Sequence, residues 1–588
     1  MNTAQDNKTH SITMKWSHLT IIGLVAIGNT QPLTNPYSKW SQAASIQGLV
    51  VDLGYGRFGG KQDSSLNAWL GLRYAASTAG IRRFQAPQVP DGNDTRTASA
   101  TDWPVQCTQG SGSGSEDCLF LNVHAPQNAS NLPVFVFIHG GGYNQGSAAF
   151  NPTGFIEDNN NGFVTVFIQY RLGVFGFLSS EEVKKRGQLN AGLLDMELAL
   201  QWVQTYIHLF GGDPRRVTIG GESAGAGAVM LLSLLRGGHL GDSLFTSVIG
   251  ASPYLPKQFN YDDDVAKSAY AYVASLTGCT GAQSVFDCLV QANATILSTA
   301  GQSLDNSRTY TSWGFVPVTD GVILQQLPSQ QLRRKQVNGK RILIGNNANE
   351  AQPWFTPNNI VTSADSENFF RDVFPLFSDS DFSKLKEVYP SSGDTNPHMT
   401  NYSTLGYTGP TALTMSGWAN GEQQRVNNLQ AEVLFVCPAY WLAAAFPEAW
   451  KYEFSVPPSP HGYDMGAYFY RNGNWPAEFV IAFESIWGNF IVHRDPRISQ
   501  NLACGTNCDP RTADMTQWKP WNSEQRAQLS ANMTGGTPAF YNAAGTLVPS
   551  IAEPGLSNSY TLSDGVTWEG GRGNRCKFWQ EMGPKIPQ

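Results

Sequence analysis

Residues 210–225, FGGDPRRVTIGGESAG, decide how the fold of this chain is predicted. Residues 217–219 are β-branched and predict a short buried strand, and the apolar run at 224–235 predicts a helix. The G-x-S-x-G motif at 221–225 lies where that strand turns into the helix. Because its glycines lack side chains, the turn can be sharp and can expose the Ser223 hydroxyl at the carboxyl end of a sheet. Ser223 is therefore a candidate nucleophile, which needs a base, an acid that orients the base, and an oxyanion site.

Apolar runs alternate with helical patterns on both sides of this motif. Such alternation predicts an α/β protein with a large, mostly parallel central sheet flanked by helices. Residues 261–300 are expected to be helical, and residues 360–450 to form helices and loops above the sheet. The other predicted strands are 134–138, 163–168, 247–250, 341–345 and 452–456. No linker, charge block or repeat divides the 588 residues, so one domain over residues 31–588 is expected.

The first 30 residues differ from the rest of the chain. Lys8 and Lys15 precede the apolar run 19–27, which is shorter than the roughly 20 residues that span a bilayer. This pattern predicts a secretory signal peptide over about residues 1–30, with an uncleaved anchor as the alternative. A secreted protein without stable membrane insertion is expected. Charged residues make up only 14% of the chain, with a net charge of −7 and no basic cluster, which argues against a nucleic-acid partner.

Eight cysteines agree with an oxidising destination. Two pairs are close in sequence, and we expect the bonds Cys107–Cys118 and Cys279–Cys288. Spacing does not pair Cys437, Cys504, Cys508 and Cys576, and no C-x-x-C pattern indicates a metal site. The N-x-S/T acceptors, typical of glycosylated secreted proteins, are Asn93, Asn128, Asn293, Asn401 and Asn532.

Three glycines follow the predicted strand 134–138, in the sequence His139-Gly140-Gly141-Gly142. Backbone N–H groups stabilise a developing oxyanion well because they are fixed before the reaction. We therefore predict an oxyanion hole from the N–H groups of Gly141, Gly142 and Ala224. A phosphate-binding loop is the rival interpretation, but no Lys-Ser/Thr pair follows the glycines.

The base should be a histidine that follows the nucleophile and the acid in the chain. His461 follows the predicted strand 452–456, where a parallel sheet places its chemistry, whereas His398 lies in a polar loop and His493 follows an apolar helical stretch. Glu350 follows the strand 341–345 and could fix the tautomer of His461. The alternatives for the acid are Asp464 and Glu222.

Taken together, these residues resemble the type-B carboxylesterase/lipase family on the α/β-hydrolase fold, and most of all its secreted fungal members. The resemblance covers about residues 48–496, through the serine motif, the HGGG sequence, EDCLFLNV at 116–123 and YRLGVFGFL at 170–178. It implies Ser223, Glu350 and His461 as a triad and the two disulfides expected above. In lipases of this family the first bridge closes a long flap. Only ten residues separate Cys107 from Cys118 here, which favours an esterase acting on soluble or dispersed esters.

The expected function is that of a secreted serine carboxylic-ester hydrolase with an acyl-enzyme intermediate. It would take a small-molecule ester as substrate and need no cofactor and no metal. A lipase or an acyltransferase of a secondary-metabolite pathway is the alternative, since only the substrate or the acyl acceptor differs. A non-catalytic binding or adhesion module is a remote alternative, because every catalytic position is filled. The sequence leaves the natural ester and the oligomeric state open.

Overall fold

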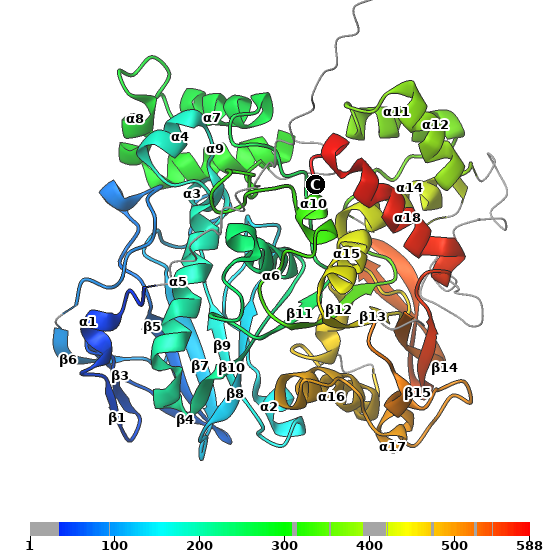
Figure 1. The fold of residues 1–588 in the computed structure, drawn as a ribbon, viewed down its shortest axis with the longest axis horizontal. Coiled ribbons are helices and arrows are strands. Elements are labelled where there is room, and N and C mark those ends of the chain that lie inside the picture. Colours follow the sequence, from blue (N-terminus) through cyan, green and yellow to red (C-terminus); the bar gives the residue numbers. More distant parts are fainter. Residues whose placement is uncertain are drawn as a thin grey trace, which may run out of the picture. The chain divides into compact units, whose positions relative to one another are not determined.

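The apolar runs of the sequence lie side by side at the centre of a large sheet (Figure 1). The computed structural model describes residues 34–92, 94–307, 314–351, 354–391, 419, 421–471, 475–521, 526–543 and 545–588. The sheet has 11 strands in the order β15-β14-β13-β12-β11-β10-β8-β9-β7-β5-β4. Their bounds are β4 Lys61–Asp63, β5 Leu66–Arg73, β7 Phe120–Pro126, β8 Leu132–Ile138, β9 Val164–Ile168, β10 Gly212–Glu222, β11 Ser247–Ala251, β12 Arg341–Asn347, β13 Glu448–Phe454, β14 Ala527–Ala543 and β15 Thr546–Asp564.

The centre of the sheet is parallel. Strands β9, β8, β10, β11, β12, β13 and β14 pair in parallel, and β7, β5 and β4 at one side and β15 at the other pair antiparallel. The parallel strands therefore end at one edge, which we call the carboxyl edge. The predicted α/β-hydrolase fold class is confirmed. Strand β10 begins at Gly212, well before the predicted residue 217, and β13 ends at Phe454, two residues before the predicted end.

A second sheet and the helices complete the described elements. The second sheet has the order β1-β2-β3-β6. Its bounds are β1 Ser45–Gln47, β2 Val50–Asp52, β3 Gly56–Gly59 and β6 Asp94–Ser99. The helix bounds are α1 Ser38–Ser41, α2 Thr153–Asp158, α3 Gly173–Phe177, α4 Glu181–Arg186, α5 Ala191–Tyr206, α6 Ala224–Leu234, α7 Asp264–Leu276, α8 Val285–Gln291, α9 Ala294–Ser307, α10 Pro328–Arg333, α11 Ser363–Val373, α12 Asp379–Val388, α14 Gly421–Ala431, α15 Cys437–Ala445, α16 Ala477–His493, α17 Gln500–Cys504 and α18 Trp568–Met582.

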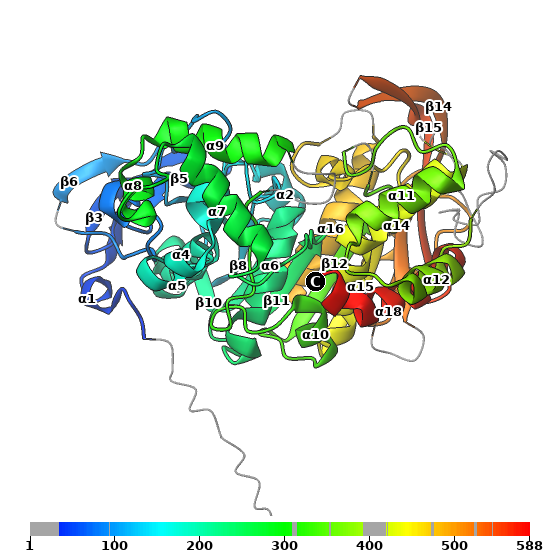
Figure 2. The same cartoon turned by 90° about the horizontal axis from the view of Figure 1, so that it is seen from above.

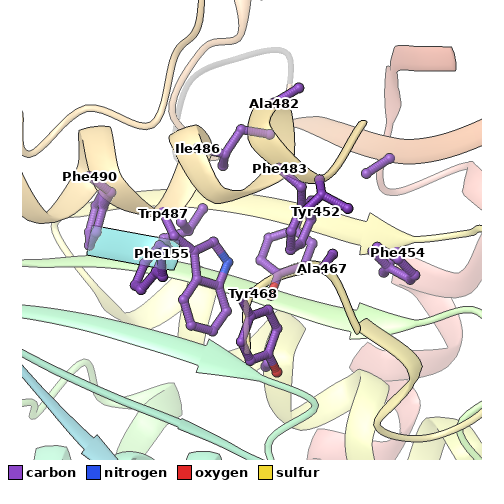
Figure 3. Packing of buried hydrophobic residues seen from close by; sticks show 14 of the residues in the cluster. Phe155, Tyr452, Phe454, Ala467, Tyr468, Ala482, Phe483, Ile486, Trp487 and Phe490 are labelled. Carbon is purple, nitrogen blue, oxygen red and sulfur yellow. The ribbon is translucent and has the colours of Figure 1, made fainter. Parts of the chain in front are cut away.

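Helices cover both faces of the parallel sheet. Helix α6 packs on β10, β11 and β8, and α15 packs on β12 and β13. Helix α16 packs on the opposite face, where alternate strand residues such as Phe135 and Tyr452 point toward it. Trp487 of α16 stacks on Tyr468 (Figure 3), and their ring centroids lie 4.4 Å apart. Each large side chain buried in this cluster contributes roughly 1.5–3 kcal/mol to stability.

The region from 360 to 450 differs in part from the prediction. Helix α15 packs directly on β12 and β13, so it belongs to a layer of the fold and not to a region above the sheet. The disulfide Cys437–Cys576 joins this helix to α18 across a sequence separation of 139 residues. Closing so long a loop restricts the unfolded chain strongly.

Residues Thr34–Gln588 form one compact unit. The single domain over residues 31–588 stays a prediction, and the signal peptide expected at about 1–30 lies outside the described residues. Within the described part of the chain, no helix combines the length and the apolarity needed to cross a membrane.

Candidate active site

Ser223 lies at the junction of β10 and α6, in the sharp turn that the sequence predicts. Its φ of 58° and ψ of −125° are unusual for a residue other than glycine. Gly225 makes this turn possible, because a Cβ atom there would lie 2.0 Å from the carbonyl oxygen of Ile138 at the end of β8. The strain holds the Ser223 side chain at the carboxyl edge, above the N-terminus of α6.

His461 and Glu350 reach Ser223 from the loops that follow β13 and β12. The Nε2 atom of His461 lies 2.7 Å from Ser223 Oγ, and its Nδ1 atom lies 2.6 Å from Glu350 Oε2. The three side chains, far apart in sequence, therefore form one continuous hydrogen-bonded line. Glu350 is fully buried, which leaves its carboxylate fixed beside the imidazole ring.

The other histidines considered from the sequence are not part of this line. His398 lies outside the described residues. His493 is exposed at the end of α16, where it lines a surface pocket with Arg341 and Glu448. These two residues begin β12 and β13, so the pocket is at the amino ends of the strands, opposite the carboxyl edge.

Two residues that the sequence analysis missed hold Glu350 in place. Ser252 Oγ donates to Glu350 Oε1 over 2.6 Å, and the backbone N–H of Asn347 donates to the same oxygen. Asn347 also donates from Nδ2 to Asp464 Oδ1 over 2.9 Å. As the last residue of β12, Asn347 had one sequence signal: a polar side chain at the end of a buried apolar run. These contacts orient the acid toward the histidine.

The alternative acids Glu222 and Asp464 lie nearby but do not bond the Nδ1 atom of His461. Glu222 Oε1 lies 3.6 Å from His461 Nε2. Burial raises the pKa of Glu222 to about 8, although the neighbouring His461 lowers it. Burial likewise raises the pKa of Asp464 to about 6, against a hydrogen bond from Asn347 that lowers it.

These carboxylates determine the charge state of His461. Burial alone would lower the pKa of His461, but Glu350, Glu222 and Asp464 outweigh it and raise this pKa above the ordinary value of 6.5. The ring is also enclosed by aromatic side chains. The ring centroid of Phe435 lies 4.3 Å from that of His461, and the centroid of Phe355 lies 5.6 Å from it. Phe435 comes from a π-helical turn, Glu432–Val436, of the kind often found at functional sites.

The glycines of the HGGG sequence lie beside Ser223. A Cβ atom on Gly140 would lie 3.0 Å from that of Ser223. Gly141 has a φ of +103°, and a Cβ atom there would lie 2.1 Å from the carbonyl oxygen of Gln145. The backbone N–H groups of Gly141, Gly142 and Ala224 donate to no protein acceptor in the described part of the chain. They are therefore free to bind an oxygen of a ligand.

All eight cysteines are bonded. Besides the two expected pairs, the bonds are Cys437–Cys576 and Cys504–Cys508. Among the predicted glycan acceptors, Asn128 and Asn293 are exposed. Asn93 and Asn401 lie outside the described residues. Asn532 lies inside β14 and is only 3% exposed, so its amide has no room for a glycan and we withdraw that site.

Comparison with known proteins agrees with the geometry of the site. Residues 47–543 match the model of the carboxylesterase family. Carboxylesterase patB of Aspergillus clavatus is 30% identical over 74% of this chain and 85% of its own length. The secreted triacylglycerol lipase LIP1 of Gibberella zeae is 30% identical over 65% of this chain and 67% of its own. Among solved structures, EstA of Aspergillus niger superposes with a TM-score of 0.71 and 25% identity, covering 92% of this chain and 99% of that one.

Proposed function

We propose, from the premise that this chain belongs to the carboxylesterase family and is a carboxylic ester hydrolase, that Ser223, His461 and Glu350 are its catalytic triad. The observation that carries the proposal is the hydrogen-bonded line from Glu350 Oε2 through both ring nitrogens of His461 to Ser223 Oγ. Each residue follows a strand at the carboxyl edge, so the backbone holds all three before any substrate arrives.

The proposed reaction has two similar halves. His461 takes the proton of Ser223 as the oxygen attacks the ester carbonyl, and Glu350 stabilises the resulting imidazolium. The N–H groups of Gly141, Gly142 and Ala224 hold the negative oxygen of the tetrahedral intermediate. The carbon–oxygen bond to the alcohol then breaks, and the alcohol leaves with the proton of His461. Water attacks the acyl-enzyme in the same way and releases the acid.

A fluorophosphonate probe tests the nucleophile directly. We expect one equivalent of probe on Ser223, read by peptide mass spectrometry, with parallel loss of ester hydrolysis. The variant His461→Ala should react far more slowly, since it lacks the base. Labelling at another serine, or none while hydrolysis persists, would contradict the assignment.

We propose that the protein is secreted and acts on soluble or dispersed esters. Four disulfides and the exposed acceptors Asn128 and Asn293 support secretion, and mass spectra of the secreted protein test it through glycan mass at these sites. The short loop between Cys107 and Cys118 supports an esterase without a large lid. A lipase or an acyltransferase shares the same site, and competition between water and an added alcohol separates transfer from hydrolysis.

The pH dependence of ester hydrolysis should reflect the charges of the carboxylates around His461. His461 accepts a proton only when neutral, so kcat/KM should fall as the pH drops through its pKa. Because this pKa is raised, we expect the midpoint of the acidic limb to lie above pH 6.5. Asp464, whose pKa is about 6, is ionised at this midpoint, so Asp464→Asn removes a charge that favours the imidazolium and should move the midpoint to lower pH. The profile is measured with a water-soluble ester between pH 5 and pH 9.

A matched control is Asp264→Asn, which removes an exposed carboxylate on α7 and should leave the profile unchanged. If the Asp464→Asn profile coincided with that of the wild type, the charge of Asp464 would not act on His461.

A further inference from the structure

The hairpin of β14 and β15 extends far beyond the strand next to it. Only residues 528–531 of β14 pair with β13, while β14 and β15 stay paired as far as Ala543 and Thr546. The strands are parallel, so the remaining 12 residues of β14 run on past the carboxyl edge, a path of roughly 40 Å if extended. In Figure 2 the hairpin projects beyond the helices beside it, at the upper right of the view.

A bulge divides the hairpin into two halves. The register shifts between Gly535 and Thr537, and Gly535, Gly536 and Gly555 all have positive φ. A bulge of this kind bends both strands. We call residues 537–543 and 545–552 the distal hairpin.

One face of the distal hairpin packs on the loop that carries His461. The ring of Tyr541 meets that of Tyr463 edge-on at 5.2 Å, and Ser550 Oγ donates to the carbonyl oxygen of Pro457 over 3.1 Å. Val548, which pairs with Tyr541, is fully buried. The distal hairpin is therefore held beside the ester site by its own contacts.

The other face carries apolar side chains into solvent. Phe540 is 69% exposed and Leu547 is 66% exposed. Leu547 pairs with Asn542, two residues from Phe540, so the two apolar side chains share one face. Two more exposed aromatic residues lie on segments that follow strands at the carboxyl edge. They are Trp354, shortly after Glu350, and Tyr470, shortly after His461.

Charge distinguishes this hairpin from an ordinary exposed strand pair. No residue from Ala527 to Ala552 is charged, although 14% of the chain is. Proteins usually place charges on exposed edge strands to prevent association. An apolar, uncharged hairpin matches a surface that is itself apolar and uncharged. It would have no electrostatic attraction to an anionic polymer or membrane.

We propose that the distal hairpin docks the enzyme on an uncharged lipid–water interface, such as the surface of a dispersed ester, with Phe540 and Leu547 as the inserted side chains. This inference rests on the proposed function, since it assigns dispersed esters as a substrate class of the same site. Docking here places the Ser223 site beside the ester phase without the movement of a lid.

The first experiment measures binding without turnover. Ser223→Ala protein is mixed with neutral phosphatidylcholine vesicles and separated by flotation, alone and with Phe540→Ser and Leu547→Ser together. We expect the double substitution to weaken binding about tenfold or more, since two buried apolar side chains are lost. Phe540→Trp should strengthen binding, because indole favours the interface. Ile46→Ser and Ile81→Ser remove exposed apolar side chains elsewhere and should have no effect.

The second experiment compares two ester substrates in the enzyme with Ser223 intact. With the double variant, kcat/KM for dissolved p-nitrophenyl acetate should stay within about twofold, while the rate on emulsified tributyrin falls about tenfold. An equal loss on both substrates would mean that the hairpin only supports the His461 loop and would overturn the proposal. Unchanged flotation, binding that requires anionic lipid, or a dimer in sedimentation that the double variant dissociates would also overturn it. If the wild type hydrolyses no dissolved ester, the proposed function fails, and flotation still decides docking.

Discussion

Ser223→Ala should lower kcat for a dissolved ester by about 10⁴- to 10⁶-fold, the largest change in activity that we expect from one substitution. The reason is chemical, because alanine has no oxygen to attack the ester carbonyl and the other groups of the site cannot replace it. His461 and the three backbone N–H groups would remain and could support only weak attack by water. The measurement is turnover of p-nitrophenyl acetate under saturating conditions.

The fold should survive this change. Ser223 Oγ forms a hydrogen bond with His461 Nε2, so the substitution removes this bond at a site that tolerates a small side chain. Ser233→Ala is a matched control, since Ser233 is a buried serine of α6 whose hydroxyl donates to the carbonyl oxygen of Val229. It should keep kcat within about twofold. If Ser223→Ala kept a tenth of the wild-type kcat, another group would have to be the nucleophile.

The central part of the fold and the three candidate residues were predictable because the sequence around each of them marks the end of a strand of the parallel sheet. The run before His139, the turn at Ser223 and the strands before Glu350 and His461 each combine a buried apolar segment with a polar or glycine-rich end. Parallel strands place all such ends at one edge, so separate local signals point to one site. Ser252 was missed because a supporting hydrogen bond leaves no pattern in the sequence. Asn347 left only the polar end of a buried apolar run, which does not by itself indicate a bond to Glu350.

The C-terminal part of the chain gave no such signals. Strands β14 and β15 are rich in Gly, Ser, Thr and Asn and contain Pro538, Pro549 and Pro554, so neither alternation nor β-propensity marks them. Their length comes from pairing with each other over most of their residues. Helix α18 similarly carries charged residues that sequence patterns would place in solvent, yet Arg572 and Arg575 are buried. In both cases tertiary contacts override local preference.

Arg572→Met should produce the largest loss of stability that we expect, about 3–5 kcal/mol in the free energy of unfolding. Arg572 is 1% exposed and pairs with Glu432, Glu453 and Glu569. Its Nη1 atom lies 2.7 Å from Glu453 Oε2, and its Nε atom lies 3.1 Å from Glu432 Oε1. Glu432 keeps Arg575 as a second ion-pair partner, whereas among the described residues Glu453 and Glu569 form ion pairs with Arg572 alone. Methionine fills similar volume, so the lost charge is the main change.

The loss of stability caused by Arg572→Met should depend on pH. Burial raises the pKa of Glu569 well above its ordinary value even in the wild type, where the coulombic attraction of Arg572 opposes the rise. Above about pH 4.3 this group therefore makes both folded proteins bind more protons than the unfolded chain, but without the guanidinium its pKa rises further, so the folded variant keeps its proton at pH values where the folded wild type has lost it. Stability should therefore fall more steeply in the variant as the pH increases. Urea unfolding at pH 5 and pH 9 measures this, and the difference from the wild type should be larger at pH 9.

A second substitution separates the loss of charge balance from a packing defect. Arg572→Met combined with Glu569→Gln removes one carboxylate that has lost its partner, and should recover about 1–3 kcal/mol relative to Arg572→Met alone. Arg371→Met breaks the exposed pair with Asp379 and should change stability by less than about 1 kcal/mol. If Glu569→Gln recovered nothing and the loss were equal at both pH values, the defect would be one of packing. Arg572 would then stabilise α18 through its volume, and its charge would contribute little.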